Sequence, residues 1–396
     1  MIQLLSRRWT AIALLIVLLG LLTACSGAPP ANSWPGMIVD GTTAYVASSD
    51  QVLALDTSIN ISEKARQLQG WPLHQINASI AFHSQPALSA DRKTLYVGTD
   101  AVTGNSGGII AYNIDSPSNK EYLTSKWTYP MTDTDPNPGN IYGGLVLVSD
   151  TLYFAGGSGK LYAIDVNTHN LRWPQPFDTG ARVWSSPAVG GNRVYVASQD
   201  HHLYAVNADN GTLAWKFPAD GAPAIGTLAG SPAVFGDTIY VGSFDSNLYA
   251  IGLNGQQKWV FKAGRLWDPP VEVDGTLYFG DLDGNVYALD AKTAQPKWPK
   301  PVTVIGGVRA TPLVANGVVY VGTDQFKVYA LDATNGQSKW QAPYAARDGD
   351  SFLSTPALSG DILVIAPNLA TGDPIRLYGL NKDIGAMLWR FPAATQ

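Results

Sequence analysis

The stretch that decides the fold is Ser231-Pro-Ala-Val234, followed by Thr238-Ile-Tyr-Val-Gly242, Asn247-Leu-Tyr-Ala-Ile251 and Gln256-Gln-Lys-Trp259. Each run is short, rich in β-branched or aromatic residues and bounded by turn residues, which is typical of β-strands. Asn254-Gly255 stands between the third and fourth runs, and Asn-Gly is the strongest sequence signal for a tight hairpin. The stretch therefore predicts four consecutive antiparallel strands.

The same unit recurs along most of the chain. Copies begin near Trp34, Gln85, Gly143, Ser186, Ser231, Asp268, Thr311 and Thr355. Their fourth runs share one tryptophan: Trp71, Trp127, Trp173, Trp215, Trp259, Trp298, Trp340 and Trp389. Their second runs share a tyrosine, replaced by Val364 in the last copy: Tyr45, Tyr96, Tyr153, Tyr195, Tyr240, Tyr278 and Tyr320. Four strands in about 40–45 residues form a propeller blade, so we predict an all-β, eight-bladed β-propeller with these aromatics between neighbouring sheets.

Composition limits the function classes. Only 14% of the 396 residues are charged and the formal net charge is −5, whereas about 25% is usual. Long amphipathic helices need charged faces, and a general nucleic-acid binder needs a basic surface. Neither class fits this chain. A single cysteine also excludes an intrachain disulfide.

The first residues predict an export signal. Arg7 and Arg8 precede an apolar run over residues 10–22, and Leu22-Thr-Ala-Cys25 resembles the lipobox of bacterial lipoproteins. That resemblance implies a signal peptide over 1–24, a lipidated Cys25 opening a flexible tether over 25–33, and a propeller over 34–396. The alternative is an ordinary signal peptide with an incidental cysteine.

The third and fourth runs resemble a known repeat. Val286-Tyr-Ala-Leu-Asp290 with Lys297-Trp298, like Val328-Tyr-Ala-Leu-Asp332 with Lys339-Trp340, is similar to the repeat of pyrroloquinoline-quinone (PQQ) propellers. That family includes quinoprotein alcohol dehydrogenases and the BamB lipoproteins of the outer-membrane β-barrel assembly machine. A lipobox and a single propeller resemble the BamB branch more closely. The resemblance implies a non-catalytic scaffold that binds a protein partner.

The chemistry of a quinoprotein enzyme is missing from the sequence. The dehydrogenases of the family stack PQQ against a disulfide of adjacent cysteines, and this chain has no second cysteine. Asp281-Leu-Asp283-Gly284-Asn285 lacks the glutamate of a calcium loop and is interpreted as a turn. His201-His202 beside Asp200 could hold a metal, but adjacent strand residues point to opposite faces, so we expect a solvated hairpin tip. We predict no enzymatic activity, cofactor or metal.

The segments that open three blades carry the candidate binding residues. Arg182-Val-Trp184, Arg265-Leu-Trp267-Asp268 and Val308-Arg309 each precede a blade-opening proline. Equivalent places gather at one end of the channel, and Arg and Trp are enriched at binding hot spots. In BamB-like proteins an arginine before this proline and acids in a nearby loop contact the barrel-forming partner. Arg182 matches the first element, and Asp268 matches the second more loosely. The alternative is that the tryptophans pack between blades while the arginines pair with neighbouring acids.

These features predict a monomeric, lipid-anchored extracytoplasmic scaffold for an envelope or membrane protein, on the outer membrane if the organism has one. The alternatives are a ligand-binding or quinone-dependent propeller and a carbohydrate-binding surface lipoprotein. Three insertions, Ala101–Gly108, Met131–Tyr142 and Ala366–Arg376, mark variable surface with either a recognition role or none.

Overall fold

A computed structural model describes residues 36–48, 51–58, 66–68, 71, 73–74, 80–101, 107–114, 125–132, 135–346, 351–368 and 375–392. The chain divides into two compact units, Met1–Asn32 and Ser33–Gln396, and every described residue lies in the second. None of the helices in these described ranges has the length and apolar character to cross a membrane. The predicted signal peptide and Cys25 lie outside the described residues.

The described strands form eight antiparallel sheets, each built from consecutive stretches of chain. The first four sheets contain β1 (Gly36–Asp40), β2 (Thr43–Ser48), β3 (Gln51–Asp56) and β4 (Leu73–His74); β5 (Ile80–Phe82), β6 (Ala87–Leu88), β7 (Thr94–Ala101), β8 (Gly108–Asn113) and β9 (Ser125–Tyr129); β10 (Val146–Val148), β11 (Thr151–Ala155), β12 (Lys160–Asp165) and β13 (Phe177–Asp178); β14 (Ala188–Gly190), β15 (Arg193–Ala197), β16 (Leu203–Asn207) and β17 (Leu213–Phe217).

The last four sheets repeat this plan. They contain β18 (Ala233–Phe235), β19 (Thr238–Gly242), β20 (Asn247–Gly252) and β21 (Gln257–Lys262); β22 (Val271–Val273), β23 (Thr276–Gly280), β24 (Asn285–Asp290) and β25 (Val302–Thr303); β26 (Leu313–Ala315), β27 (Val318–Gly322), β28 (Lys327–Asp332) and β29 (Tyr344–Ala345); β30 (Ala357–Ser359), β31 (Ile362–Ile365), β32 (Leu377–Asn381) and β33 (Met387–Phe391). We number these sheets blades 1 to 8 in chain order.

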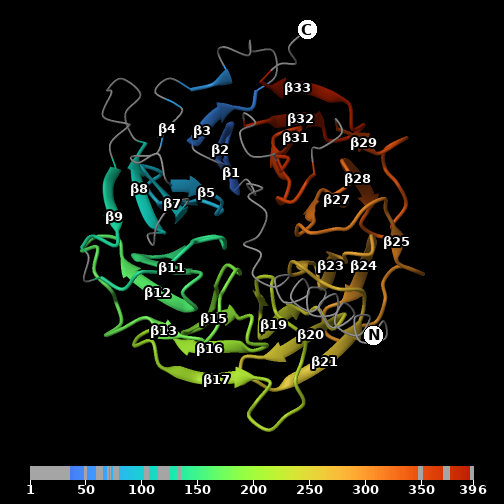
Figure 1. The fold of residues 1–396 in the computed structure, drawn as a ribbon. Helices are drawn as coiled ribbons and strands as arrows, with labels where there is room; N and C mark the ends of the chain where they lie inside the picture. Colours follow the sequence, from blue (N-terminus) through green and yellow to red (C-terminus); the bar gives the residue numbers. More distant parts are fainter. Residues whose placement is uncertain are drawn as a thin grey trace, which may run out of the picture. The chain divides into compact units, whose positions relative to one another are not determined.

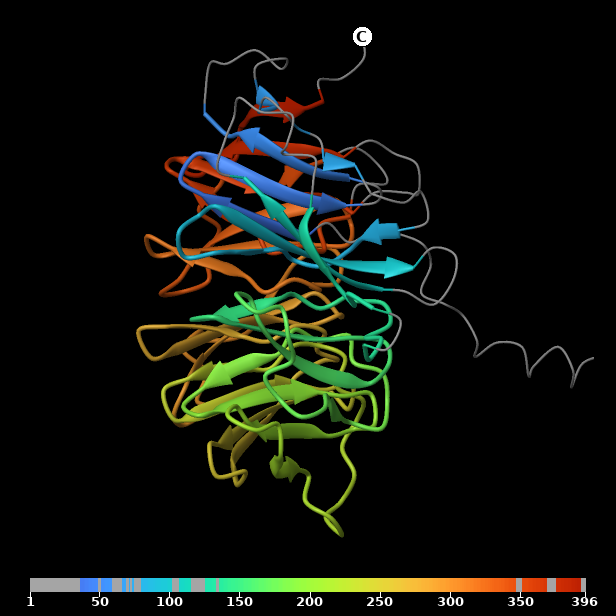
Figure 2. The ribbon, with the colours of Figure 1, turned by 90° about the vertical axis from the view of Figure 1, so that its left-hand side faces the viewer.

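The blades form a closed ring (Figure 1). Within a blade the strands run outward from the first to the last, as β15, β16 and β17 show in Figure 1. First strands of neighbouring blades touch, for example β14 with β18 and β22 with β26, and β30 of blade 8 touches β1 of blade 1. Figure 2 shows the twisted sheets from the side of the ring. The predicted eight-bladed propeller is confirmed. One difference is that blade 2 opens with two short strands, β5 and β6, because both pair with the long β7.

Every shared tryptophan is buried or half-buried, and most join their blade to the next by a hydrogen bond. The indole N–H donates to the backbone carbonyl that follows the third strand of the next blade. The pairs are Trp173 to Ala208 (2.8 Å), Trp215 to Leu253 (2.9 Å), Trp259 to Ala291 (3.2 Å), Trp298 to Ala333 (3.0 Å), Trp340 to Lys382 (3.0 Å) and Trp389 to Thr57 (3.1 Å). The interblade position predicted for the tryptophans is therefore confirmed, and each ring also satisfies its buried donor.

The turn glycines of the next blade complete this contact. Gly211 has a φ of 74°, and a Cβ on it would lie 2.6 Å from Cδ2 of Trp173. Gly255, Gly336 and Gly385 are placed in the same way under Trp215, Trp298 and Trp340. In blade 3 the turn residue is His169, whose ring stacks on Trp127 with centroids 4.9 Å apart. The Asn-Gly motif therefore indicates an interblade contact as well as a hairpin.

Blades 1 and 8 close the ring without exchanging a strand, because each blade is made from one continuous stretch. The seam between them uses side chains. Arg66, which is 3% exposed, places its guanidinium 4.2 Å from the ring centroid of Trp389. The hydroxyl groups of Thr57 and Ser359 are buried and lie 2.6 Å apart. The first and last blades are thus joined by a buried cation–π contact and a pair of hydroxyl groups, and not by a strand from one end of the chain entering the blade of the other end.

In seven of the eight blades, the residues after the tryptophan separate two kinds of outermost strand; blade 7 is the exception, because Trp340 is followed by glutamine and β29 still has only two residues. After the tryptophan, blades 1, 3 and 6 continue with proline, as in Trp173-Pro174, and their outer strands have only two residues. Proline cannot donate to a ladder, so it interrupts the strand. Blades 2, 4, 5 and 8 have Trp-x-Phe or Trp-x-Tyr instead, and their outer strands span five or six residues.

The two glycines of blade 4 allow a test of the tryptophan contact. Gly191 and Gly211 both have positive φ, but nothing lies within 4 Å of a Cβ at Gly191. Gly191→Ala should lower the free energy of unfolding by about 1 kcal/mol through backbone strain. Gly211→Ala should cost a further ~1–3 kcal/mol because its methyl group overlaps Trp173. Thermal and urea unfolding of the two variants measure this difference, and equal losses would contradict the contact.

Candidate functional site

The segments that lead into the blades share one alternating pattern. Each has a buried apolar residue at its centre: Phe82, Ile141, Val183, Leu228, Leu266, Val308 and Phe352. The glycine that ends a second strand makes room for it, since a Cβ on Gly242 would lie 2.5 Å from Leu266 Cβ and one on Gly280 would lie 2.4 Å from Val308 Cβ. Because the central side chain is inserted into the ring, its two neighbours are left for the surface. We call the candidate residues beside these centres the mouth: Arg182, Trp184, Arg265, Trp267, Asp268 and Arg309.

The two Arg-x-Trp segments have a fixed backbone and free arginine side chains. The carbonyl oxygen of Arg182 accepts the N–H of Gln199 at 3.1 Å, and that of Arg265 accepts the N–H of Leu282 at 2.9 Å. Both arginines are exposed, and neither forms an ion pair with any residue of the described ranges. The alternative interpretation, in which the arginines pair with neighbouring acids, therefore finds no support for Arg182 and Arg265 in the described part of the chain.

Trp184 of blade 4 and Trp267 of blade 6 meet across blade 5. Their rings are stacked at 29°, with centroids 6.5 Å apart. Blade 5 allows this because it contributes only Ala229 and Gly230 at the equivalent place, and a Cβ on Gly230 would lie 1.6 Å from the Trp267 carbonyl oxygen. Phe244 extends the aromatic surface, 5.7 Å from Trp267. Both tryptophans remain half-buried, so they keep an accessible surface.

Arg309 of blade 7 adds a cation to this stack. Its guanidinium carbon lies 5.3 Å from the ring centroid of Trp267, and its Nε lies 3.2 Å from Oδ2 of Asp324. Arg309 is half-buried and paired, as the alternative interpretation of the arginines proposed for such residues. Its charge is largely compensated by Asp324, so its main contribution to the mouth is to hold Trp267 in place.

Asp268 lies below this surface, in a belt of hydrogen bonds between blades. Its Oδ2 accepts the backbone N–H of Thr311 in blade 7 at 3.2 Å. Serine hydroxyls play the equivalent part elsewhere: Ser186 accepts from the N–H of Gly144 at 2.6 Å, and Ser231 accepts from the N–H of Ser186 at 2.9 Å. Burial raises the pKa of Asp268 to about 7, although the hydrogen bond from Thr311 works in the opposite direction. The contact of Asp268 is therefore structural, and partner binding by it stays a prediction.

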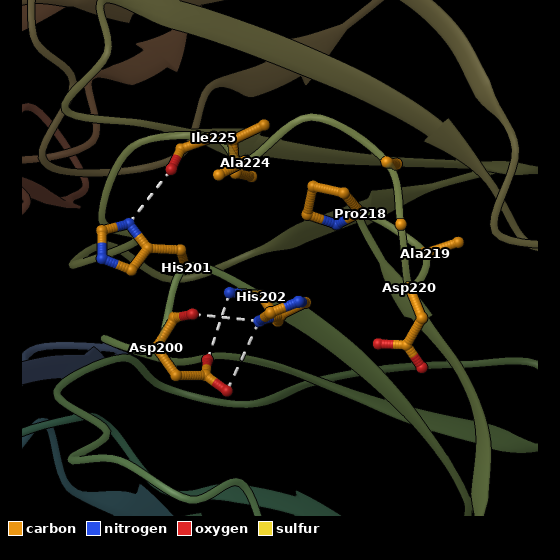
Figure 3. A pocket seen from close by; sticks show the side chains of 10 residues that line it. Asp200, His201, His202, Pro218, Ala219, Asp220, Ala224 and Ile225 are labelled. Atoms are coloured by element: carbon orange, nitrogen blue, oxygen red, sulfur yellow. Dashed lines mark hydrogen bonds and ion pairs between the residues drawn. The ribbon is translucent and has the colours of Figure 1, made fainter.

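A cavity of about 310 Å³ opens beside the mouth, between the blade 4 hairpin tip at Asp200–His202 and the connection from Pro218 to Ile225 (Figure 3). His201 lies in the turn with a φ of 74°, not in a strand. The hairpin-tip position of the histidines is confirmed, and both residues line this cavity. Strand alternation, on which the expectation of opposite faces depended, does not apply to His201 because this residue lies in the turn.

The described residues include no group of three His, Cys, Asp or Glu side chains placed to hold a metal. Asp281 lies in a turn between β23 and β24, as predicted. Its carboxylate accepts hydrogen bonds from the N–H groups of Gly264 and Asn285 and from the Tyr287 hydroxyl, at 2.8–3.0 Å. These contacts give the aspartate a structural role that needs no ion.

Sequence reasoning brought together Trp184, Trp267 and Arg309 correctly, but it missed Asp324, Phe244 and the cavity. A signal for Asp324 was present, because an aspartate recurs at the tips of these hairpins. In three blades the carboxylate of this aspartate accepts a hydrogen bond from the N–H of a glycine in the connection that leads into the blade. The pairs are Asp245 with Gly226, Asp281 with Gly264 and Asp324 with Gly307. The cavity had no such signal, since its wall is a connection that only blade 4 carries in this form.

The family of the chain follows from its sequence. A profile of the family described as "Outer membrane protein assembly factor BamB" matches residues 124–262 and 252–396, which together span more than half of the chain. The chain belongs to this family. The predicted resemblance to BamB-type repeats is thereby confirmed.

Solved structures support the BamB-family fold. The crystal structure of BamB from Moraxella catarrhalis superposes with a TM-score of 0.60 at 14% identity, covering 89% of this chain and 94% of that one. The computationally designed Ika8 protein superposes with a TM-score of 0.64 at 12% identity, covering 88% and 97%. No curated protein matches the chain. At these identities the structures support the fold alone.

The raised pKa of Asp268 predicts a pH dependence of stability. Its folded pKa, about 7, lies above the unfolded value of 3.8, so between these values the folded state binds more protons than the unfolded state. Stability should fall as pH rises through this window, by at most about 1.4 kcal/mol per pH unit. Asp268→Asn keeps an acceptor for Thr311 but cannot ionise. Urea unfolding from pH 4 to 8 should give a flatter profile for the variant, and parallel profiles would disprove the assignment.

Proposed function

We propose that this BamB-family protein is a non-catalytic, lipid-anchored scaffold of the bacterial envelope that binds a protein partner through the mouth. The observation that carries the proposal is the pair of exposed arginines, Arg182 and Arg265, on fixed backbone beside the stacked Trp184 and Trp267. The family description supports an envelope location. Assembly of outer-membrane proteins is the specific role that this description suggests.

The physical argument rests on preorganisation. Binding costs less when the contact residues are already ordered, and arginine and tryptophan supply most of the large energies found at protein interfaces. Here the tryptophans are held by each other, by Phe244 and by Arg309. The arginines are free to pair with acidic groups of a partner. A partner with acidic and apolar side chains on one surface fits this arrangement.

The absence of catalysis is part of the proposal. A catalytic acid or base needs a proton-accepting or proton-donating atom that is open to a substrate. Two acids of the mouth are engaged, Asp268 by Thr311 and Asp324 by Arg309 and Gly307. These contacts support a binding surface rather than an active site.

The lipid anchor gives the first test. Cys25 is the only cysteine of the chain and a thiolate is the side chain best suited to alkylation. In a bacterial host, wild-type protein should incorporate labelled palmitate and sediment with membranes, whereas Cys25→Ser should lose both properties. Equal membrane recovery of the variant, without label in the wild type, would contradict lipidation.

The mouth gives the second test. Arg182→Glu combined with Arg265→Glu should reduce capture of cross-linked envelope proteins from the native organism at least tenfold, because two attractive pairs become repulsive. The control is Lys292→Glu combined with Lys300→Glu, which makes the same change in net charge at exposed residues on the connection between β24 and β25. Quantitative mass spectrometry of the captured proteins provides the measurement.

The same experiment distinguishes partner docking at the mouth from partner docking at the outer edge of a blade. A partner could instead add a strand to the edge of β21, which has no proline to interrupt it. Val260→Pro would block that pairing. Capture that survives the arginine changes but is lost with Val260→Pro would overturn the mouth and assign docking to blade 5.

A further inference from the structure

The cavity beside the mouth has a chemical character that the proposed function does not use. Its polar side chains come from Asp200, His201, His202 and Asp220, and its walls include Pro218 and Ile225 (Figure 3). No lysine or arginine lines it. The cavity therefore combines two carboxylates with a largely aliphatic wall.

Hydrogen bonds fix the histidine tautomers. Nδ1 of His201 lies 3.0 Å from the carbonyl oxygen of Ile225, and Nδ1 of His202 lies 2.9 Å from that of Asp200. A carbonyl oxygen can only accept, so each Nδ1 carries the proton. In the neutral ring, each Nε2 then has an unprotonated lone pair. Both histidines are acceptors toward any ligand that reaches Nε2.

The two carboxylates of the cavity are hydrogen-bond acceptors, like the histidine Nε2 atoms. Asp200 accepts a hydrogen bond from the Tyr204 hydroxyl, which holds it at the hairpin tip. Asp220 is exposed, and its Oδ1 pairs with Nζ of Lys216 at 2.5 Å. Lys216 is the first cause of the lowered pKa of Asp220, so this carboxyl is ionised at neutral pH. The side chains of the cavity thus offer hydrogen-bond acceptors and negative charge.

The cavity is joined to the mouth. The N–H of Gln199, next to Asp200, donates to the carbonyl of Arg182. The turn that forms the cavity and the segment that presents a mouth arginine therefore lie against each other. A protein seated on the mouth would therefore lie close to the hairpin tip that forms one wall of the cavity.

We propose that this cavity binds the side chain of a lysine or arginine of the docked protein partner. The inference rests on the proposed function for its ligand, but the site is defined by the cavity itself. The aliphatic stem of such a side chain fits against Pro218 and Ile225, and its charged end donates to Asp220, Asp200 and Nε2 of His202. The partner would then present an acidic group to Arg182 and a basic one to the cavity.

The experiment uses the full-length protein in detergent with small probes instead of the partner. The chain has five histidines, so selective labelling of their ring carbons gives a simple NMR spectrum, assigned with His201→Gln and His202→Gln. N-acetyl-arginine amide and N-acetyl-lysine amide should shift the His201 and His202 signals with millimolar affinity. N-acetyl-norleucine amide, which lacks the charge, should not. Equal shifts with norleucine amide, or none with either cation, would overturn the proposal.

Two variants sharpen this result. Asp220→Asn should weaken arginine-amide binding about fivefold, the scale of one exposed charge pair. Asp237→Asn is the matched control, because Asp237 is as exposed as Asp220 and also pairs with a lysine, Lys258, at 2.6 Å, but outside the cavity. Unchanged binding by Asp220→Asn would contradict the site.

Two further arms distinguish cation binding in the cavity from docking at the mouth and from metal binding. The mouth variant with glutamate at 182 and 265 should bind the probes at least as well as wild type, so a failed partner-capture experiment and a failed probe titration are distinguishable. Zinc chloride is the competing ligand. If micromolar zinc shifts both histidine signals while the cationic amides do not, the cavity is a metal site and the proposal is wrong.

Discussion

The contact of each shared tryptophan with the next blade, a hydrogen bond in six of the eight described pairs, is the interaction on which the ring depends. A four-stranded blade is too small to bury both of its faces alone, so it is stable only between neighbours. The indole ring fills the gap between the sheets, and its N–H reaches a carbonyl that the next hairpin leaves unpaired. Because this carbonyl always follows the third strand, the contact also sets the orientation of each blade relative to the next. The segments that lead into the blades are placed around the ring by that orientation.

The mouth exists because one blade departs from the pattern. Seven connections share a buried apolar centre, but blade 5 has alanine and glycine where blades 4 and 6 have tryptophan. Two large rings from blades that are not neighbours can therefore meet over it. The mouth is thus produced by a local loss of side-chain volume within a regular ring, and the belt of hydrogen bonds that includes Asp268 lies beside it.

The sequence predicted the blades, their number and the tryptophan contacts, because each rests on a pattern that recurs eight times. It also predicted that Trp184, Trp267 and Arg309 gather at one end, since equivalent positions in a ring lie together. The pairing of Arg309 was missed, because this arginine lies in the connection before β26 whereas its partner Asp324 lies in the hairpin between β27 and β28. The cavity that His201 and His202 both line was also missed, since His201 lies in a turn with positive φ and the strand rule does not apply there.

The seam between blades 1 and 8 has a consequence for how the protein is made. The last interblade contact needs Trp389 in the outer strand of blade 8, together with Thr57 and Arg66 in blade 1. A chain emerging from its N-terminus during synthesis or export carries an unsealed arc of blades until that outer strand has appeared. Any truncation before residue 389 removes the indole that covers Arg66 and donates to the carbonyl of Thr57. The ring can therefore close only after all eight blades have been made.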